Sequence, residues 1–265
     1  MELVDRVLAV TGGGDGIGRE VVLQLLDRGA RVAAIDVRPD ALAATVQRAG
    51  AATSRLSQHI VDITDRDSVS TLPAAILAAH GQVDGLVHIA GIIQRFVPLM
   101  DLTLEEFEHV MAVNFWGAVY LDRAFLPVLM TRPEACLVAV SSMGALVPVL
   151  GQGAYSVSKA ALRLLTESWY AELRETRVAV TVVFPGGVGT NITANSGVEP
   201  PRLVEGAASR VTSAADAARA IVDAVERGSF RVVIGRDARW VDLLSRLAPR
   251  RAIIMIADRM RSLVR

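Results

Sequence analysis

The sequence predicts an α/β fold in which a doubly wound parallel sheet of about seven strands is covered by helices on both faces. Two observations support this prediction. Short aliphatic runs alternate with segments of helical period along most of the 265 residues. Hydrophobic residues make up 52% of the chain and aromatic residues only 5%, a balance typical of a buried parallel sheet. We expect one main domain over residues 1–235 and an amphipathic helical extension over residues 236–265.

Seven short runs rich in valine, isoleucine, leucine and alanine are expected to form the strands. In chain order they cover residues 7–11, 31–36, 59–62, 86–89, 137–141, 178–184 and 231–234. Helical segments lie between them, and right-handed crossovers would make the sheet parallel. The C-terminal ends of parallel strands meet at one edge, so we expect the ligand crevice there.

Two of the expected helices begin with a capping-box pattern. Thr103 is followed three residues later by Glu106, and Ser213 by Asp216, which would satisfy free amides at a helix start. The least regular stretch, at about residues 186–212, is rich in Gly, Pro, Ser and Asn. We expect it to form a lid over the crevice.

Charge and cysteine content exclude several functional classes. The 28 Lys and Arg residues balance 28 Asp and Glu residues, so no net field would recruit nucleic acid. The single cysteine, Cys136, cannot form an internal disulfide, and its place at the start of an apolar strand predicts a buried, unreactive thiol. We assign no metal site to the chain.

The start of the chain carries no recognisable targeting segment. The first expected strand begins within six residues of Met1, with no charged and then apolar leader before it. No apolar run approaches the roughly 20 residues needed to span a bilayer. We therefore expect a cytoplasmic protein.

A glycine-rich segment follows the first strand and opens the next helix. Its sequence is Thr11-Gly12-Gly13-Gly14-Asp15-Gly16-Ile17-Gly18. Glycines let the backbone approach a pyrophosphate, which the amides and dipole of the helix N-terminus would hold. We therefore expect a Rossmann-like domain whose dinucleotide contacts include Gly12, Asp15, Gly16, Ile17 and Gly18.

An acidic residue, Asp36, ends the second expected strand. A carboxylate there accepts hydrogen bonds from the adenosine ribose and repels a 2′-phosphate, which favours NAD over NADP. Arg38 favours NADP instead, because an arginine two residues after Asp36 could bind a 2′-phosphate. Asp15 adds a negative charge near the phosphate path, or is simply a solvated turn residue.

Lys159 is the only lysine in a chain that otherwise uses arginine for its positive charge. It lies four residues after Tyr155, a spacing that puts an ammonium and a phenol on one face of a helix. A compact lysine ammonium cannot be replaced by the planar fork of an arginine. The pair therefore predicts an acid/base site rather than a general need for charge.

With Thr11-Gly12-x-x-x-Gly16-x-Gly18 and Tyr155-x-x-x-Lys159, the chain resembles the short-chain dehydrogenase/reductase family over residues 5 to about 235. Ser142 lies thirteen residues before Tyr155, where the family keeps its catalytic serine, and Asn114 matches the family's structural and catalytic asparagine. The resemblance thus implies a catalytic set of Asn114, Ser142, Tyr155 and Lys159.

The resemblance also implies further cofactor contacts. They are Asp62 and Ile63 at the adenine ring, Ala90 and Gly91 beside the adenosine ribose, Pro185, Gly186, Val188 and Thr190 in the nicotinamide-side loop, and Tyr155 and Lys159. One departure is that the family usually has Asn-Asn-Ala-Gly after the fourth strand, where this chain has His88-Ile89-Ala90-Gly91. This removes a sheet-stabilising side chain but leaves the chemistry in place.

The longer epimerase and dehydratase branch of the superfamily also has a Tyr-Lys pair. Its glycine spacing is shorter and its chains are longer, so both features favour the oxidoreductases. We expect an NAD(H)-dependent oxidoreductase that interconverts a ketone and a secondary alcohol. The alternatives are an NADP(H)-dependent reductase of the 3-oxoacyl or hydroxysteroid type, and a non-catalytic dinucleotide-sensing protein.

The expected mechanism assigns one role to each catalytic residue. Tyr155 is the acid/base, and the Lys159 ammonium together with the positive nicotinamide would stabilise its anion. Ser142 would donate to the substrate oxygen as negative charge develops. By resemblance, Asn114 kinks its helix and holds a water that links Lys159 to solvent.

The expected substrate pocket is mostly apolar, which favours a small hydrophobic carbonyl or alcohol over a sugar phosphate. Its lining residues are Ile93, Gln94, Phe96, Met143, Leu150 and Ile192. Arg95 could anchor an acid group on the substrate.

The C-terminal segment is rich in arginine, with ten arginines and three acids from Arg227 to Arg265. One apolar helical face is expected from Trp240, Leu243, Leu244, Leu247, Ile253, Ile256, Met260 and Leu263. Subunit packing or cover for the sheet edge is favoured over peripheral membrane contact. By resemblance we expect a homo-oligomer, a dimer or tetramer built through the helices that hold Asn114 and Tyr155, with Trp116 and Trp169 at the contact.

Overall fold

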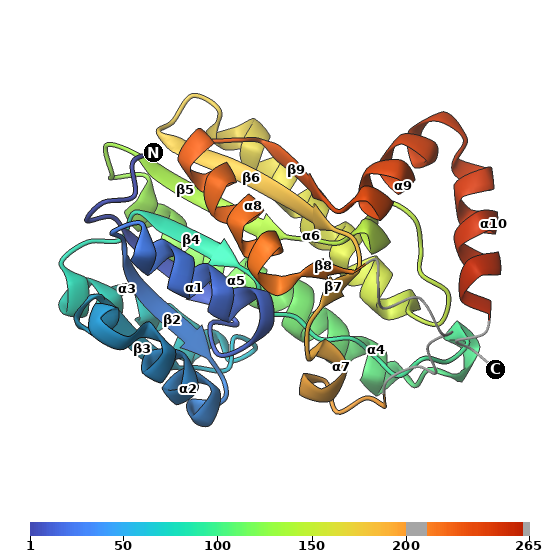
Figure 1. The fold of residues 1–265 in the computed structure, drawn as a ribbon, viewed down its shortest axis with the longest axis horizontal. Helices are drawn as coiled ribbons and strands as arrows, with labels where there is room; N and C mark the ends of the chain where they lie inside the picture. The colour runs from blue at the N-terminus through green and yellow to red at the C-terminus, as the bar shows by residue number, and fades with distance from the viewer. Residues whose placement is uncertain (200–210, 262–265) are drawn as a thin grey trace.

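A parallel sheet forms the centre of the computed structural model, which describes residues 1–199 and 211–261 (Figure 1). Across these residues it has seven strands in the order β3-β2-β1-β4-β5-β6-β9. The strands are β1 (Val7–Thr11), β2 (Arg31–Asp36), β3 (Leu56–Ile60), β4 (Gly85–His88), β5 (Ala135–Val140), β6 (Val178–Pro185) and β9 (Arg231–Ile234). The predicted fold class is confirmed. The strand order reverses between β1 and β4, where a ligand crevice forms in such sheets.

Most strand bounds agree with the sequence prediction. β1, β2 and β9 match it, and β4, β5 and β6 begin or end within two residues of it. β3 is the exception, because it covers residues 56–60 instead of 59–62. Its register pairs Leu56 with Val32 and Ile60 with Asp36. As a half-exposed edge strand it has too weak an apolar pattern to mark its start.

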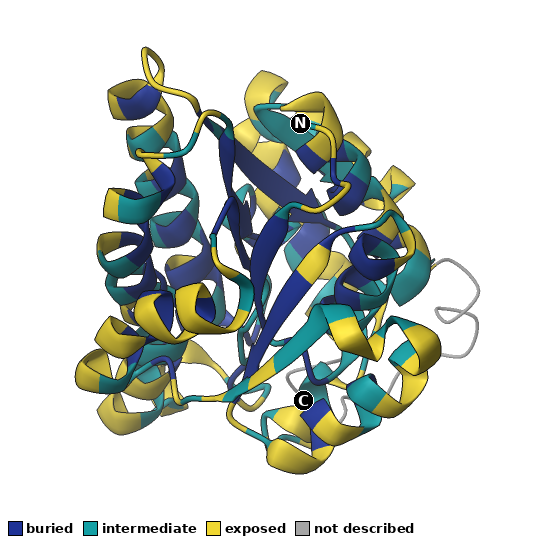
Figure 2. Ribbon diagram, turned by 90° about the vertical axis from the view of Figure 1, so that its left-hand side faces the viewer, coloured by how far each residue is buried: buried dark blue, intermediate teal, exposed yellow. Residues whose placement is uncertain are grey.

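Helices bury both faces of the sheet, whose strands are mostly buried in Figure 2. One face is covered by α1 (Gly16–Asp27), α2 (Pro39–Ala49) and α8 (Ala214–Arg227), the other by α3 (Arg66–His80), α5 (Gly117–Leu129) and α6 (Gly153–Leu173). Strand residues alternate between the two cores: Val10 and Val138 lie in the first, Ala9 and Leu137 in the second. Burial on both sides explains the near-continuous aliphatic runs.

The predicted capping box forms at α4 (Leu104–Met111). Thr103 Oγ1 accepts from Glu106 N at 3.2 Å, and Glu106 Oε2 accepts from Thr103 N at 3.0 Å. At α8 half of the box is made: Ser213 Oγ accepts from Asp216 N at 3.0 Å, but the Asp216 carboxylate accepts from the Ser213 hydroxyl.

The expected lid begins in the described part of the chain and continues into residues 200–210, which lie outside it. Its described elements are β7 (Val188–Gly189) and the short helix α7 (Ile192–Asn195). β7 pairs with β8 (Thr212–Ser213), immediately before α8. The two ends of the expected lid are therefore joined to each other by this pairing.

The C-terminal extension forms a hairpin of α9 (Arg236–Leu247) and α10 (Pro249–Met260) at one end of the molecule (Figure 1). Its apolar residues do not share one face as predicted. Leu244, Ile256 and Met260 pack against Val147, whereas Trp240, Leu243, Leu247 and Ile253 are exposed. The predicted position Leu263 lies outside the described residues.

Two smaller expectations can be compared with the structure. Cys136 is buried in β5, and this burial raises the pKa of its thiol to about 12, which makes it a poor nucleophile. Among the helices of the described residues, none combines the length and apolar character needed to cross a bilayer.

Candidate active site

The loop between β1 and α1 depends on glycine for its shape. Gly12 has φ of +68°, and a Cβ on it would lie 3.0 Å from the Ala90 backbone. A Cβ on Gly18 would lie 2.0 Å from the Gly12 carbonyl oxygen, so only glycine lets α1 begin this close to β1. The N-terminus of α1, with Gly16 and Ile17, thus lies at the C-terminal edge of the sheet, where its free amides can bind phosphate.

Asp36 is held in place beside this loop. Its Oδ2 accepts from Gly14 N and its Oδ1 from Arg38 N, both at 3.0 Å. Arg38 Nε lies 3.7 Å from Asp36 Oδ1. The carboxylate is therefore oriented where the ribose hydroxyls of an adenosine would lie, and it also attracts the arginine that could favour a 2′-phosphate.

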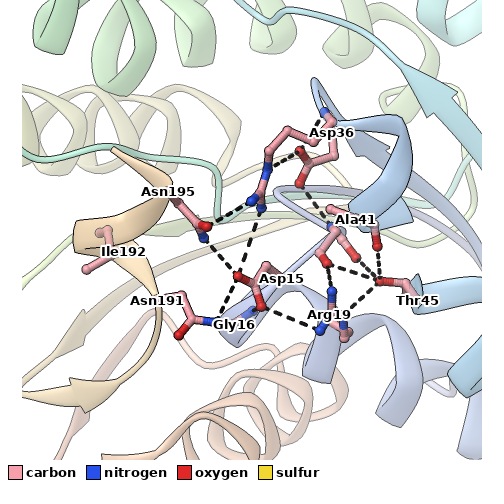
Figure 3. A network of polar contacts seen from close by, with 12 residues as sticks. Asp15, Gly16, Arg19, Asp36, Ala41, Thr45, Asn191, Ile192 and Asn195 are labelled. Atoms are coloured by element: carbon pink, nitrogen blue, oxygen red, sulfur yellow. Dashed lines mark hydrogen bonds and ion pairs between the residues drawn. The ribbon is translucent and has the colours of Figure 1, made fainter. Parts of the chain in front are cut away.

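Helix α7 is joined to the glycine-rich loop through the Asp15 carboxylate (Figure 3). Asp15 Oδ2 accepts from Asn195 Nδ2 at 2.9 Å and from Asn191 Nδ2 at 3.2 Å. Asn195 Oδ1 in turn accepts from Arg38 Nη1 at 2.8 Å. We call Asp15, Arg38, Asn191 and Asn195 the lid latch, because they link the lid to the loop and to the end of β2.

Asp15 is not a solvated turn residue. It caps α1 by accepting from Gly16 N at 2.8 Å, and Arg19 Nη1 lies 3.5 Å from its Oδ1. Burial would raise the pKa of Asp15, but the hydrogen bonds from Asn195, Gly16 and Asn191 and the charge of Arg19 outweigh it and lower that pKa. The Asp15 carboxylate therefore stays ionised at neutral pH.

The acid/base pair predicted from the lone lysine lies on α6. Lys159 is 4% exposed and donates to the Val140 carbonyl oxygen at 3.0 Å, at the end of β5. Its Nζ lies 5.9 Å from the centre of the Tyr155 ring. A strand end and a helix thus fix the ammonium behind the phenol.

Asn114 lies in a π-helical turn, Ala112–Trp116, between α4 and α5. The amide exchanges two hydrogen bonds with the Ile92 backbone, at 2.8 and 2.9 Å, and donates to Ser158 Oγ at 2.9 Å. A Cβ on Gly91 would lie 3.1 Å from both Asn114 Oδ1 and Lys159 Nζ. These polar atoms therefore converge on a backbone position that glycine keeps open. π-Turns of this kind often occur at functional sites.

Ser142 follows β5 and is nearly buried. Its Oγ accepts from Gly144 N at 3.0 Å, in the short 3-10 turn Met143–Ala145. The hydroxyl also makes a hydrogen bond with the Tyr155 phenol. The structure thus brings the four predicted catalytic residues together.

The electrostatics of the pair differ from the sequence expectation. Burial raises the pKa of the Tyr155 phenol above its usual value, and the hydrogen bond with Ser142 lowers it by less. Burial also lowers the pKa of the Lys159 ammonium from 10.5 to about 8. The protein by itself therefore does not produce a low tyrosine pKa, and the positive nicotinamide has to supply part of the stabilisation.

The expected pocket residues fall into two groups. Phe96, Met143, Leu150 and Ile192 are partly exposed, as a pocket lining requires. Ile93 and Gln94 are buried, and Gln94 Oε1 accepts from Tyr155 N at 2.9 Å. Gln94 therefore positions the start of α6. The Arg95 guanidinium is bound to the Glu106 carboxylate and to the Asp101 carbonyl oxygen, so its expected role as an acid anchor stays a prediction that requires the exchange of these bonds.

The departure at His88 is compensated by a different contact. His88 Nε2 lies 2.7 Å from Asp122 Oδ1, and Asp122 Oδ2 accepts from Trp169 Nε1 at 2.8 Å. These three side chains join β4, α5 and α6. Trp169 is thus used inside the subunit, while Trp116 remains half exposed.

Three contributors were missed in the sequence. Asp237 Oδ2, in the first turn of α9, accepts from Gly187 N at 2.8 Å in the loop that begins Pro185-Gly186. A Cβ on Gly186 would lie 2.2 Å from this carboxylate, so Gly186 and Asp237 require one another. Asn191 and Asn195 of the latch were the other two. Their residue types are common in loops, and only their spacing of one helical turn could have drawn attention.

Comparison with known proteins identifies the family. The profile of the short chain dehydrogenase family matches residues 6–200. The chain belongs to the short-chain dehydrogenase/reductase family. SadH of Mycobacterium tuberculosis, which is named as an oxidoreductase without a stated substrate, is 35% identical over 251 residues, or 91% of this chain and 90% of SadH. A Streptomyces avermitilis relative, 1-deoxy-11-beta-hydroxypentalenate dehydrogenase, is 33% identical over 90% of this chain and 88% of its own.

Solved structures of family members are similar in fold. A short-chain dehydrogenase/reductase of Burkholderia phymatum in complex with NAD has a TM-score of 0.80 and 27% identity, covering 88% of this chain and 90% of its own. A short-chain dehydrogenase of Burkholderia cenocepacia in complex with NADP has a TM-score of 0.78 and 27% identity, covering 98% and 99%. Family membership thus implies a dinucleotide and leaves open which of the two.

The residues of this chain fit a nicotinamide dinucleotide. Gly12 and Gly18 give the loop its close approach, Asp36 is oriented at the end of β2, and Gly91 leaves the space before Asn114 and Lys159 open. Asp62 is exposed and turned toward its own loop, where its Oδ1 accepts from Thr64 N and Thr64 Oγ1. Its expected adenine contact remains a prediction.

Replacing Lys159 by methionine should stabilise the protein at neutral pH. The wild-type pKa falls from 10.5 to about 8 on folding, which corresponds to about 3 kcal/mol. Because the unfolded chain keeps the proton between these pH values, wild-type stability should rise with pH across this window, and the variant should lose that rise.

Urea unfolding at pH 7 and near pH 10 measures both effects. Arg163→Met, one turn further along α6, is the control and should keep the wild-type pH slope. Equal slopes for wild type and Lys159→Met would contradict the burial cost assigned to the ammonium.

Proposed function

We propose that the protein is an NAD(H)-dependent oxidoreductase that interconverts a ketone and a secondary alcohol. The observation that carries the proposal is the position of the single lysine, which is buried with its Nζ 5.9 Å from the centre of the Tyr155 ring, while Ser142 is hydrogen-bonded to the phenol. A buried ammonium is costly, so its retention beside a phenol favours acid/base chemistry over a packing role.

Each residue of the site has a task in this reaction. When bound, the dinucleotide supplies or accepts the hydride. Tyr155 donates a proton to the substrate oxygen during reduction and removes it during oxidation. Ser142 holds that oxygen, because its Oγ is oriented by Gly144 N and its proton can turn from the Tyr155 phenol to the substrate. Lys159 stabilises the phenolate, and Asn114, bound to Ile92 and Ser158, positions α6 against the π-turn.

The preference for NAD over NADP rests on Asp36. Its carboxylate would repel a 2′-phosphate, and Arg38 is engaged by Asn195 and attracted to Asp36 rather than free to bind that phosphate. The choice of NAD is proposed from these residues alone, since one relative of this fold was crystallised with NAD and another with NADP.

The substrate is proposed to be a small hydrophobic carbonyl or alcohol. The partly exposed lining residues Phe96, Met143, Leu150 and Ile192 are apolar, and Arg95 is already paired. The name of the Streptomyces avermitilis relative states that it is a dehydrogenase of a hydroxypentalenate. That name supports an alcohol-bearing substrate here.

Tyr155→Phe tests the acid/base assignment. We expect turnover to fall at least about a hundredfold, because the proton donor is lost, while NADH affinity stays within about twofold. Steady-state NADH oxidation and NADH fluorescence titration measure the two quantities. Tyr120→Phe, which changes a tyrosine stacked on Trp116, is the matched control. Near-wild-type turnover in Tyr155→Phe would refute the assignment.

Asn195→Ala tests the role of the lid latch in cofactor choice. The variant frees Arg38 from its hydrogen bond at 2.8 Å, so the ratio of kcat/KM for NADPH to that for NADH should rise several-fold. Asn191→Ala, which loses a bond to Asp15 but none to Arg38, should leave the ratio unchanged. A similar rise in both variants, or none in Asn195→Ala, would contradict this role.

A further inference from the structure

The outer face of α9 is apolar although at least half of each of its large side chains is exposed in the described chain. Trp240, Leu243 and Leu247 are 50%, 58% and 75% exposed. Their spacing of three and four residues places them on one line along the helix. The adjoining side of α9 supplies the packing, through Val241 and Leu244, which lie in one apolar cluster with Val147, Ala252 and Ile256. α9 therefore has two apolar sides, of which the core uses one.

Arginines accompany this exposed stripe. Arg236 continues the same helical line, and Arg239 and Arg246 lie beside it. From residue 236 to residue 261 the hairpin has seven arginines and three aspartates, a formal charge of +4. Since the whole chain is neutral, the remaining residues carry the balancing negative charge. The molecule is thus polarised, with its hairpin end positive.

Of the arginines beside the stripe, only Arg246 is neutralised by one of the three aspartates. Asp237 binds Gly187 N, Asp242 pairs with Arg231 and Arg246, and Asp258 pairs with Arg261. Within residues 1–199 and 211–261, no acidic partner lies within ion-pair distance of five exposed arginines. They are Arg236, Arg239, Arg250, Arg251 and Arg259. The stripe and its arginines therefore fit a partner that is both apolar and negatively charged.

A hairpin-to-hairpin contact between two copies does not fit this description. With the hairpins on a two-fold axis, the arginines of one would face those of the other. Cover for the sheet edge does not account for the stripe either, because the stripe is exposed while Val241 and Leu244 supply the packing of α9. We therefore depart from the order that the sequence favoured.

We propose that the α9–α10 hairpin docks the protein on an anionic lipid bilayer. A tryptophan and leucines on one helical line, flanked by arginines, have the composition of a helix that lies in the membrane interface. The docked face adjoins the site, because Asp237 of α9 binds the Pro185–Gly187 loop and the hairpin packs on Val147 in the segment after Ser142. An apolar substrate dissolved in the bilayer would be concentrated next to the pocket.

Vesicle sedimentation of the full-length protein tests the docking without requiring turnover. We expect binding to phosphatidylcholine vesicles that contain about one third phosphatidylglycerol, weaker binding when salt is raised, and none to phosphatidylcholine alone. Absence of binding to the anionic vesicles, or equal binding to both kinds, would overturn the proposal.

Two pairs of variants separate the apolar and charged contributions. Leu243→Ser with Leu247→Ser should weaken partitioning at least tenfold, and Arg236→Gln with Arg239→Gln about fivefold for each arginine removed. The matched controls are Ile60→Ser with Met130→Ser, which are similarly exposed apolar residues elsewhere, and Arg66→Gln with Arg177→Gln. Wild-type partitioning in either hairpin pair, or an equal loss in its control, would contradict the proposal.

Measuring the mass of the protein in solution tests whether the exposed face of α9 is instead a subunit interface. The Leu243→Ser and Leu247→Ser variant should keep the wild-type oligomeric state and NADH affinity. If its mass falls to that of a smaller assembly, the stripe is a subunit interface and the bilayer proposal is wrong. Because NADH affinity and vesicle binding are read separately, loss of the proposed enzymatic activity would leave this test intact.

Discussion

The site depends on keeping one ammonium group buried at the C-terminal edge of the sheet. Lys159 is held by the Val140 carbonyl oxygen and lies beside Asn114, close to the backbone of Gly91. Burial makes its charge costly, and the pKa falls to about 8. The strand end, the π-turn and α6 have to be placed together to hold this charge. An arginine, which needs more donors satisfied in a plane, would not fit the same arrangement.

The second half of the site depends on a partly buried carboxylate rather than a cation. Asp15 caps α1 and also receives Asn191 and Asn195 from the lid, while Arg38 connects the lid to Asp36. The same group of atoms therefore links the glycine-rich loop, the end of β2 and α7. Asp237 makes a comparable link between the nicotinamide-side loop and α9. The lid and the C-terminal hairpin are thus both coupled to the cofactor crevice through single carboxylates.

The fold and the catalytic cluster were predictable because they rest on local patterns. Aliphatic runs at regular spacing mark the strands, and the TGxxxGxG and YxxxK spacings fix chemistry within one loop and one helical turn. The contacts of Gln94, Asp237 and Asn195 were not predictable, because each joins segments far apart in the sequence through a common residue type. The ion pair of Arg95 was missed for the same reason, since its partner Glu106 lies on another element. Even the pKa of Tyr155 depends on burial, which no spacing reports.

The most direct test of the central claim replaces the single lysine by arginine, the residue that carries the other positive charges of the chain. In NADH oxidation with a ketone substrate, Lys159→Arg should lose turnover by about a hundredfold or more while NADH binding is retained. The reverse exchange one turn away, Arg163→Lys, should have wild-type turnover. Near-wild-type turnover in Lys159→Arg would contradict the account. A wild-type protein that binds NADH tightly but turns over no ketone would point instead to a dinucleotide-sensing protein.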